Sequence, residues 1–148
     1  MLNTSYKLKM TPDEIIRMAS IIEKEAKDPG ERKIISGIFY YNRLNSKDQS
    51  LRKLQSCATI QYIYFYKEGI FKEKIYTKDT KIVDPYNTYE NPGLPPGPIC
   101  SPGRDSIDAA LNPQKTDYLF FVATGNGRTQ FSKTWDEHQT AMIKYGIN

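Results

Sequence analysis

Hydrophobic residues recur every three or four positions between residues 12 and 26, and this spacing predicts an amphipathic helix. Thr11 can cap this helix, Pro12 suits its first position, and Glu14 can complete a capping box with Thr11. The apolar stripe, which should face a core, consists of Ile15, Met18, Ala19, Ile22 and Ala26.

Two glutamates flank this stripe. Glu23 lies on one shoulder, against Ile16 and Ala19, and Glu25 lies on the other, further from the centre. A carboxyl half-buried among aliphatic groups has a raised pKa, because burial disfavours its charged form. A general acid that works near neutral pH needs such a pKa, so Glu23 is the candidate. The helix alone favours a simpler interpretation, a boundary glutamate that reaches solvent or pairs with Lys27.

The rest of the pattern mixes helices with a small antiparallel sheet. Further helices are expected at residues 31–44, 56–66, 105–111 and 135–145, and strands at residues 51–55, 118–124 and 128–132. The two kinds of element do not alternate, so the expected fold class is α+β, with helices packed on a small antiparallel sheet. Residues 1–10 are expected to be a flexible leader and residues 11–148 a single domain.

The segment from residue 84 to residue 103 holds six prolines and three glycines. Such a segment can be neither a helix interior nor a central strand. Aromatic and amide residues punctuate it, which separates it from a low-complexity linker. We therefore expect a long ordered loop that lines a groove with Tyr86, Asn87, Tyr89 and Leu94.

Composition removes several classes of function. The net charge of +4 is spread along the chain, without the basic cluster of a nucleic-acid face. One histidine, His138, and two cysteines, Cys57 and Cys100, do not form a metal-ligand set, so no metal or cofactor is expected. Thiols are favoured over a disulfide. No apolar run approaches the roughly 20 residues that span a bilayer, so no membrane span is expected.

Several blocks in a fixed order carry a family resemblance: ASIIEKEA, ERKIISGIFYYNRL, LQS, YNTY, GLPPGPI, SPGRDSIDAALNP, DYLFFVA and FSKTWDEH. From about Thr11 to Lys144 the chain resembles the catalytic domain of endolytic murein transglycosylases, the YceG-like family. Larger members carry an N-terminal membrane helix and a LysM-like domain, which this chain does not match.

The resemblance implies which residues form the site. The first glutamate of the block A-S-I-x-E-K-E, Glu23 in this chain, is implied as the catalytic acid. The residues expected to line the sugar groove are Asn42, Arg43, Gln55, Tyr86, Asn87, Thr88 and Tyr89. The chain departs from the family pattern at Cys57-Ala58, where Asp-Pro is usual, at Thr129-Gln130, where a histidine is common, and at Asp84, where serine is common. The missing carboxylate at position 57 matters most, because it could orient substrate or tune the acid.

The implied reaction is cleavage of the β-1,4 bond between N-acetylmuramic acid and N-acetylglucosamine, with 1,6-anhydro ends. One carboxyl group suffices, because the sugar's own 6-hydroxyl replaces water as the nucleophile. A hydrolysing muramidase, which would need a second acid such as Asp84 or Glu90, and a non-catalytic wall-binding module are the alternatives. The resemblance implies glycan strands and cell-wall synthesis proteins as partners, and the extracytoplasmic face of the bacterial membrane as location, with no anchor in this chain.

Overall fold

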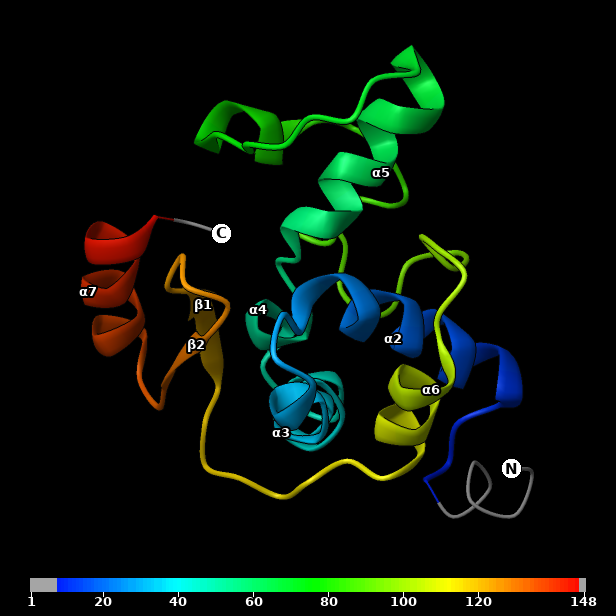
Figure 1. Cartoon of the computed structure of the whole chain (residues 1–148), viewed down its shortest axis with the longest axis vertical. Coiled ribbons are helices and arrows are strands. Elements are labelled where there is room, and N and C mark those ends of the chain that lie inside the picture. Colours follow the sequence, from blue (N-terminus) through cyan, green and yellow to red (C-terminus); the bar gives the residue numbers. More distant parts are fainter. Residues whose placement is uncertain (1–7, 147–148) are drawn as a thin grey trace.

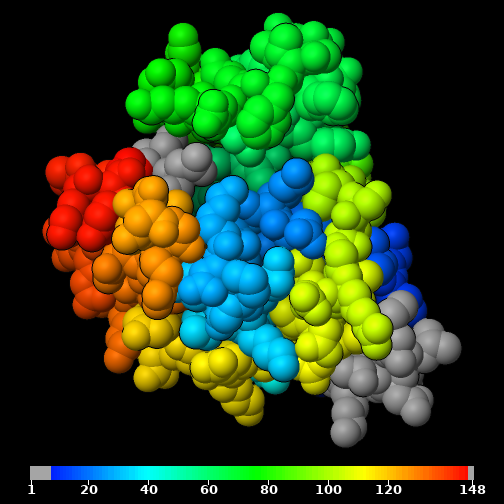
Figure 2. All heavy atoms as spheres, in the orientation of Figure 1, coloured from blue at the N-terminus to red at the C-terminus, as the bar shows by residue number. Residues whose placement is uncertain are grey.

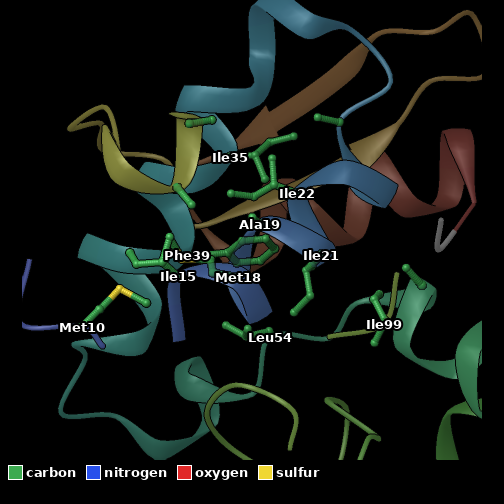
Figure 3. Packing of buried hydrophobic residues seen from close by; sticks show 14 residues of the cluster. Met10, Ile15, Met18, Ala19, Ile21, Ile22, Ile35, Phe39, Leu54 and Ile99 are labelled. Atoms are coloured by element: carbon green, nitrogen blue, oxygen red, sulfur yellow. The ribbon is translucent and has the colours of Figure 1, made fainter. Parts of the chain in front are cut away.

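The computed structural model describes residues 8–146, and its centre is the helix α2, Pro12–Glu25. The expected capping box is present. The Glu14 backbone N–H donates to the Thr11 hydroxyl oxygen, and the Thr11 backbone N–H donates to the Glu14 carboxylate. Most of the apolar stripe of α2 is fully buried. Figure 3 shows Phe39 among Ile15 and Met18 of α2, at the middle of the core.

Helices surround α2, and a two-stranded antiparallel sheet lies to one side (Figure 1). The helices beside α2 are α3 (Arg32–Gly37), α5 (Cys57–Glu68) and α6 (Arg104–Leu111). The strands β1 (Phe120–Ala123) and β2 (Thr129–Ser132) pair in the register Phe120 to Ser132, and α7 (Trp135–Tyr145) packs on them. The expected α+β class is confirmed.

The expected helix at residues 31–44 is present in three pieces. A 3-10 turn, η1 (Pro29–Glu31), leads into α3, and a π-helix, η2 (Ile38–Leu44), continues it. A π-helix is rare and often occurs at functional sites.

The strand expected at residues 51–55 is wrong. Residues Gln49–Arg52 form a helical turn, α4, because the Asp48 side chain accepts from the Ser50 backbone N–H and caps it. Gln55 then takes a positive φ of 55°, which a strand does not allow. A further 3-10 turn, η3 (Thr77–Lys81), follows α5.

The segment from residue 84 to residue 103 contains neither helix nor strand, as expected, and it is tied to α2. The Ile99 backbone N–H donates to Ser20 Oγ over 3.1 Å, and Arg17 donates to the Pro95 carbonyl over 3.1 Å. Most of the expected leader lies outside the described residues, but Met10 is buried in the core. Among residues 8–146 no helix is both long and apolar enough to cross a membrane.

Gly37 tests how tightly the centre is packed. A Cβ at this position would lie 1.6 Å from the Gln114 carbonyl oxygen, so Gly37→Ala should lower the free energy of unfolding by about 3 kcal/mol. Urea denaturation measures the change. Gly30→Ala is the matched control, because its Cβ would meet only Asp28 Oδ1 at 3.4 Å. Equal stabilities for the two variants would contradict this close packing.

Candidate functional site

Glu23 serves as an anchor for α6. Its Oε1 accepts from the Gly103 backbone N–H over 2.8 Å and from Ser106 Oγ over 3.0 Å, at the first turn of that helix. The bond from Gly103 is the main reason why the pKa of Glu23 is lowered, with Ser106, Arg32 and Lys24 acting in the same direction. The raised pKa expected for Glu23 from its helical position is therefore wrong.

Glu25 occupies the environment that was expected around Glu23. Its Oε1 accepts from Ser56 Oγ over 2.5 Å and from the Ala58 backbone N–H over 3.4 Å, at the first turn of α5. Part of the residue stays accessible, yet burial of the carboxyl raises its pKa and outweighs these two bonds. Glu25 is thus the carboxyl that holds a proton more readily than usual.

A narrow hollow of about 90 Å³ opens onto Glu25, and it can take only part of a longer ligand. Its polar and charged lining residues, apart from Glu25, are Lys24, Lys27, Arg43, Gln55, Cys57, Gln61, Thr129 and His138. Among the described lining residues, Glu25 is the only carboxylate. Neither Asp84 nor Glu90 lines the hollow, and Asp84 is instead paired with Lys67 over 3.1 Å.

Among the residues expected to line a groove, Gln55 is well placed to contact a ligand. Its side chain lines the Glu25 hollow and also a neighbouring hollow of about 170 Å³. Its left-handed backbone is held by a bond from its N–H to the Thr88 carbonyl over 3.2 Å. Such a conformation costs a residue with a Cβ about 1 kcal/mol or more, and strain of this kind gathers at functional sites.

His138 sits where the same two hollows meet. Its ring stacks on Phe120, with centroids 4.9 Å apart, and only 8% of the residue is exposed. Burial, assisted by the charge of Arg43, lowers the pKa of His138 to about 4, so the ring is neutral near pH 7. Within the described residues the buried Nδ1 has no hydrogen-bond partner.

Arg43 lines the Glu25 hollow, but its guanidinium mainly braces the fold. Its nitrogens donate to the carbonyls of Leu51, Lys53 and Leu119, and the residue is 4% exposed. Three carbonyls from two distant segments are thereby fixed around one side chain. The cation also adds to the lowering of the His138 pKa, which burial mainly causes.

Cys57, which lines the Glu25 hollow, shares a hydrogen bond of 3.0 Å with the Tyr89 hydroxyl. Burial raises the pKa of Cys57 to about 12, with the Glu25 charge contributing, so the thiol is neutral. Burial also raises the pKa of Tyr89, which lines the 170 Å³ hollow. Cys57 and Cys100 are not joined by a disulfide.

The other expected groove residues do not line the Glu25 hollow. Asn87 is fully buried, and its side chain donates to the Thr80 and Ile82 carbonyls and accepts from the Tyr89 backbone N–H. Thr88 accepts from the Ser56 backbone N–H. The last two of the expected groove residues are Tyr86 and Asn42. The Tyr86 ring packs against Tyr62 and Tyr66. The Asn42 amide donates to the Thr116 and Tyr118 carbonyls.

The helical pattern placed Glu25 on the less central shoulder of α2 and did not select it. The missing information was tertiary, because α5 packs over that shoulder and buries it. A usable signal was the run Ser56 to Thr59, a helix start whose free N–H groups favour a nearby carboxylate. Lys24, Lys27 and Gln61 were missed as lining residues for the same reason.

Comparison with known proteins gives consistent matches. A family model described as the YceG-like family matches residues 2–144. The chain is similar to proteins named endolytic murein transglycosylase. The one from Bacillus subtilis is 44% identical over 139 residues, which cover 94% of this chain and 36% of that protein. The one from Streptococcus pneumoniae is 38% identical over 142 residues, which cover 92% of this chain and 24% of that protein. A crystal structure of a yceG-like protein from Listeria monocytogenes has a TM-score of 0.81 at 44% identity, over 94% of this chain and 43% of that one. The chain thus spans 36% or less of these curated relatives.

The buried amide of Asn87 yields the first prediction at the site. Asn87→Ala leaves two carbonyls and one N–H without their partner, so the free energy of unfolding should fall by about 2 kcal/mol. Thermal unfolding measures the loss. An unchanged melting temperature would contradict this bracing role of Asn87.

Proposed function

Because the chain belongs to the YceG-like family, we propose that it cleaves peptidoglycan glycan strands as an endolytic lytic transglycosylase. The bond broken is the β-1,4 linkage between N-acetylmuramic acid and N-acetylglucosamine, and the new end is a 1,6-anhydromuramic acid. The observation that carries this proposal is the single carboxyl with a raised pKa, Glu25, in a hollow lined by no other described carboxylate.

We propose Glu25 as the acid, whereas the family resemblance implies Glu23, because the pKa of Glu25 is raised and that of Glu23 is lowered. Protonated Glu25 donates to the leaving O4 of N-acetylglucosamine as the bond to C1 of N-acetylmuramic acid breaks. The resulting carboxylate then takes the proton of the C6 hydroxyl of the same muramic acid, and that oxygen bonds to C1. The proton returns to Glu25 and no water is consumed. Ser56 and the Ala58 N–H hold the carboxyl in place during both steps.

The position of Glu25 suits cleavage inside a strand. One neighbouring hollow shares Gln55, Phe121 and His138 with the Glu25 hollow. The Gln55 amide can bind sugar hydroxyl and acetamido groups there. A peptidoglycan substrate implies that the protein acts outside the cytoplasm. Contact with cell-wall synthesis proteins stays an expectation from the family resemblance.

Glu25→Gln tests the acid directly. The amide keeps the shape of the carboxyl but cannot deliver a proton, so strand cleavage should fall by about 100-fold or more. Mass spectrometry of the released fragments measures it. The parent's products should be anhydro ends, lighter by one water than reducing ends. Reducing ends from the parent would favour a hydrolysing muramidase instead.

Glu23→Gln is the matched control, two residues away on the same helix. It weakens the contact with the first turn of α6, so it should lower stability by about 1 kcal/mol and leave cleavage within about threefold of the parent. Abolished cleavage in folded Glu23→Gln, together with substantial activity in Glu25→Gln, would return the role of acid to Glu23.

The two carboxyls should also affect the pH dependence of stability with opposite signs. The folded pKa of Glu25 lies above 4.5, so its ionisation costs stability as pH rises from 4.5 through the folded value. Relative to the parent, Glu25→Gln should therefore gain stability between about pH 4 and about pH 7. Glu23, with its lowered pKa, contributes stability above 4.5 that is lost as pH falls through its folded value. Urea unfolding at both pH values checks the two signs, and parallel pH profiles for the two variants would contradict them.

A further inference from the structure

A third hollow, of about 620 Å³, lies beside the Glu25 hollow and is lined in part by α5. It shares Lys24, Lys27, Ala58 and Gln61 with the Glu25 hollow, so the two are continuous along the start of α5. Its outer wall includes two aromatic side chains that the fold leaves mostly in solvent, Phe65 at 58% and Phe71 at 65% exposure. We refer to it as the Phe65–Phe71 hollow.

The wall that carries Phe71 is built by the chain turning back against α5. The helix ends at Gly69, whose φ of 70° takes the left-handed conformation that suits glycine at a helix end. The Gln61 amide then donates to the Lys72 carbonyl over 3.2 Å and to the Glu73 carbonyl over 3.0 Å. Residues 70–74 are thereby held to α5, in the part of the chain that stands above the rest in Figures 1 and 2.

We propose that the Phe65–Phe71 hollow binds further saccharide units of the glycan strand that Glu25 cleaves. This inference rests on the proposed function. Pyranose rings present flat faces of C–H groups, and exposed aromatic rings are suitable surfaces for them because apolar area leaves water on both sides. The ammonium groups of Lys24 and Lys27, which line both hollows, can donate hydrogen bonds to the hydroxyl and acetamido oxygens of the sugars.

The surroundings of the two phenylalanines favour a glycan over a packing role in the core and over contact with a lipid surface. A core role does not apply, because more than half of each residue is open to solvent. An anionic lipid surface is disfavoured, because Glu68 and Glu73 lie among the lysines of the same segment and dilute its positive charge. The volume lies in the range of roughly 300–1,000 Å³ that is usual for ligand sites.

The Glu25 hollow shares lining residues with the Phe65–Phe71 hollow and, through other residues, with the 170 Å³ hollow, so a strand can be held on both sides of the broken bond. Cleavage should therefore depend on strand length. In this proposal a tetrasaccharide of two disaccharide units occupies the sites nearest Glu25, and a longer strand also contacts Phe71.

The test compares cleavage of purified long glycan strands with cleavage of this tetrasaccharide. Phe71→Ala should raise KM for long strands roughly five- to tenfold and leave kcat and the tetrasaccharide kinetics unchanged. Phe71→Tyr, which keeps the ring, should restore the parental KM. Ile143→Ala, at a residue 88% exposed on α7, is the control and should change neither substrate's kinetics.

The outcomes separate this inference from the proposed function. If the parent chain cleaves both substrates and Phe71→Ala affects both equally or neither, the inference fails while the function stands. If vesicles containing anionic lipid bind the parent but not Phe71→Ala, and the length dependence is unchanged, the hollow is a membrane contact and the inference is overturned. If the parent cleaves neither substrate, the proposed function fails and the inference falls with it.

Discussion

The last turn of α2 holds two other helices by their first turns, and the rest of the site depends on this arrangement. Glu23 accepts from the start of α6 and Glu25 from the start of α5. Residues two positions apart on a helix are separated by about 200°, so the two carboxyls face different neighbours. Helix starts offer unpaired N–H groups and a positive end of the helix dipole, which both carboxylates satisfy. One short segment therefore fixes how three helices meet.

The same contact has opposite chemical results at the two positions. Around Glu23 the bonds from Gly103 and Ser106 outweigh the modest burial, and the pKa falls. Around Glu25 burial outweighs the bonds from Ser56 and Ala58, and the pKa rises. A glutamate that faces the start of another helix thus has a lowered pKa when water still reaches its carboxyl. Its pKa is raised when the surrounding fold excludes that water.

Local signals in the sequence were sufficient for α2 with its capping box, for α7 after Thr134, for the β1–β2 hairpin and for the irregular segment 84–103. They failed where tertiary contacts decide the conformation. The turn at residues 49–52 depends on its Asp48 cap, and the positive φ of Gln55 depends on the Thr88 carbonyl. The periodicity of α2 identified both shoulder glutamates, but it could not show which of them α5 would cover. Polar residues such as Asn87 and Asn42 were assigned to ligand binding, whereas the structure uses their amides to hold backbone carbonyls.

The π-helix η2 has a consequence for comparing sequences. A π-helix holds more residues per turn than an α-helix does, so its seven residues sit in a register that an ordinary helix would not produce. Deleting one of them would rotate the end of the helix by about 100°. Arg43 would then leave the three carbonyls that it joins, and the hairpin would lose its tie to the loop before α5. In an alignment, a one-residue gap between Ile38 and Leu44 would therefore signal a relative whose hairpin is fastened in another way.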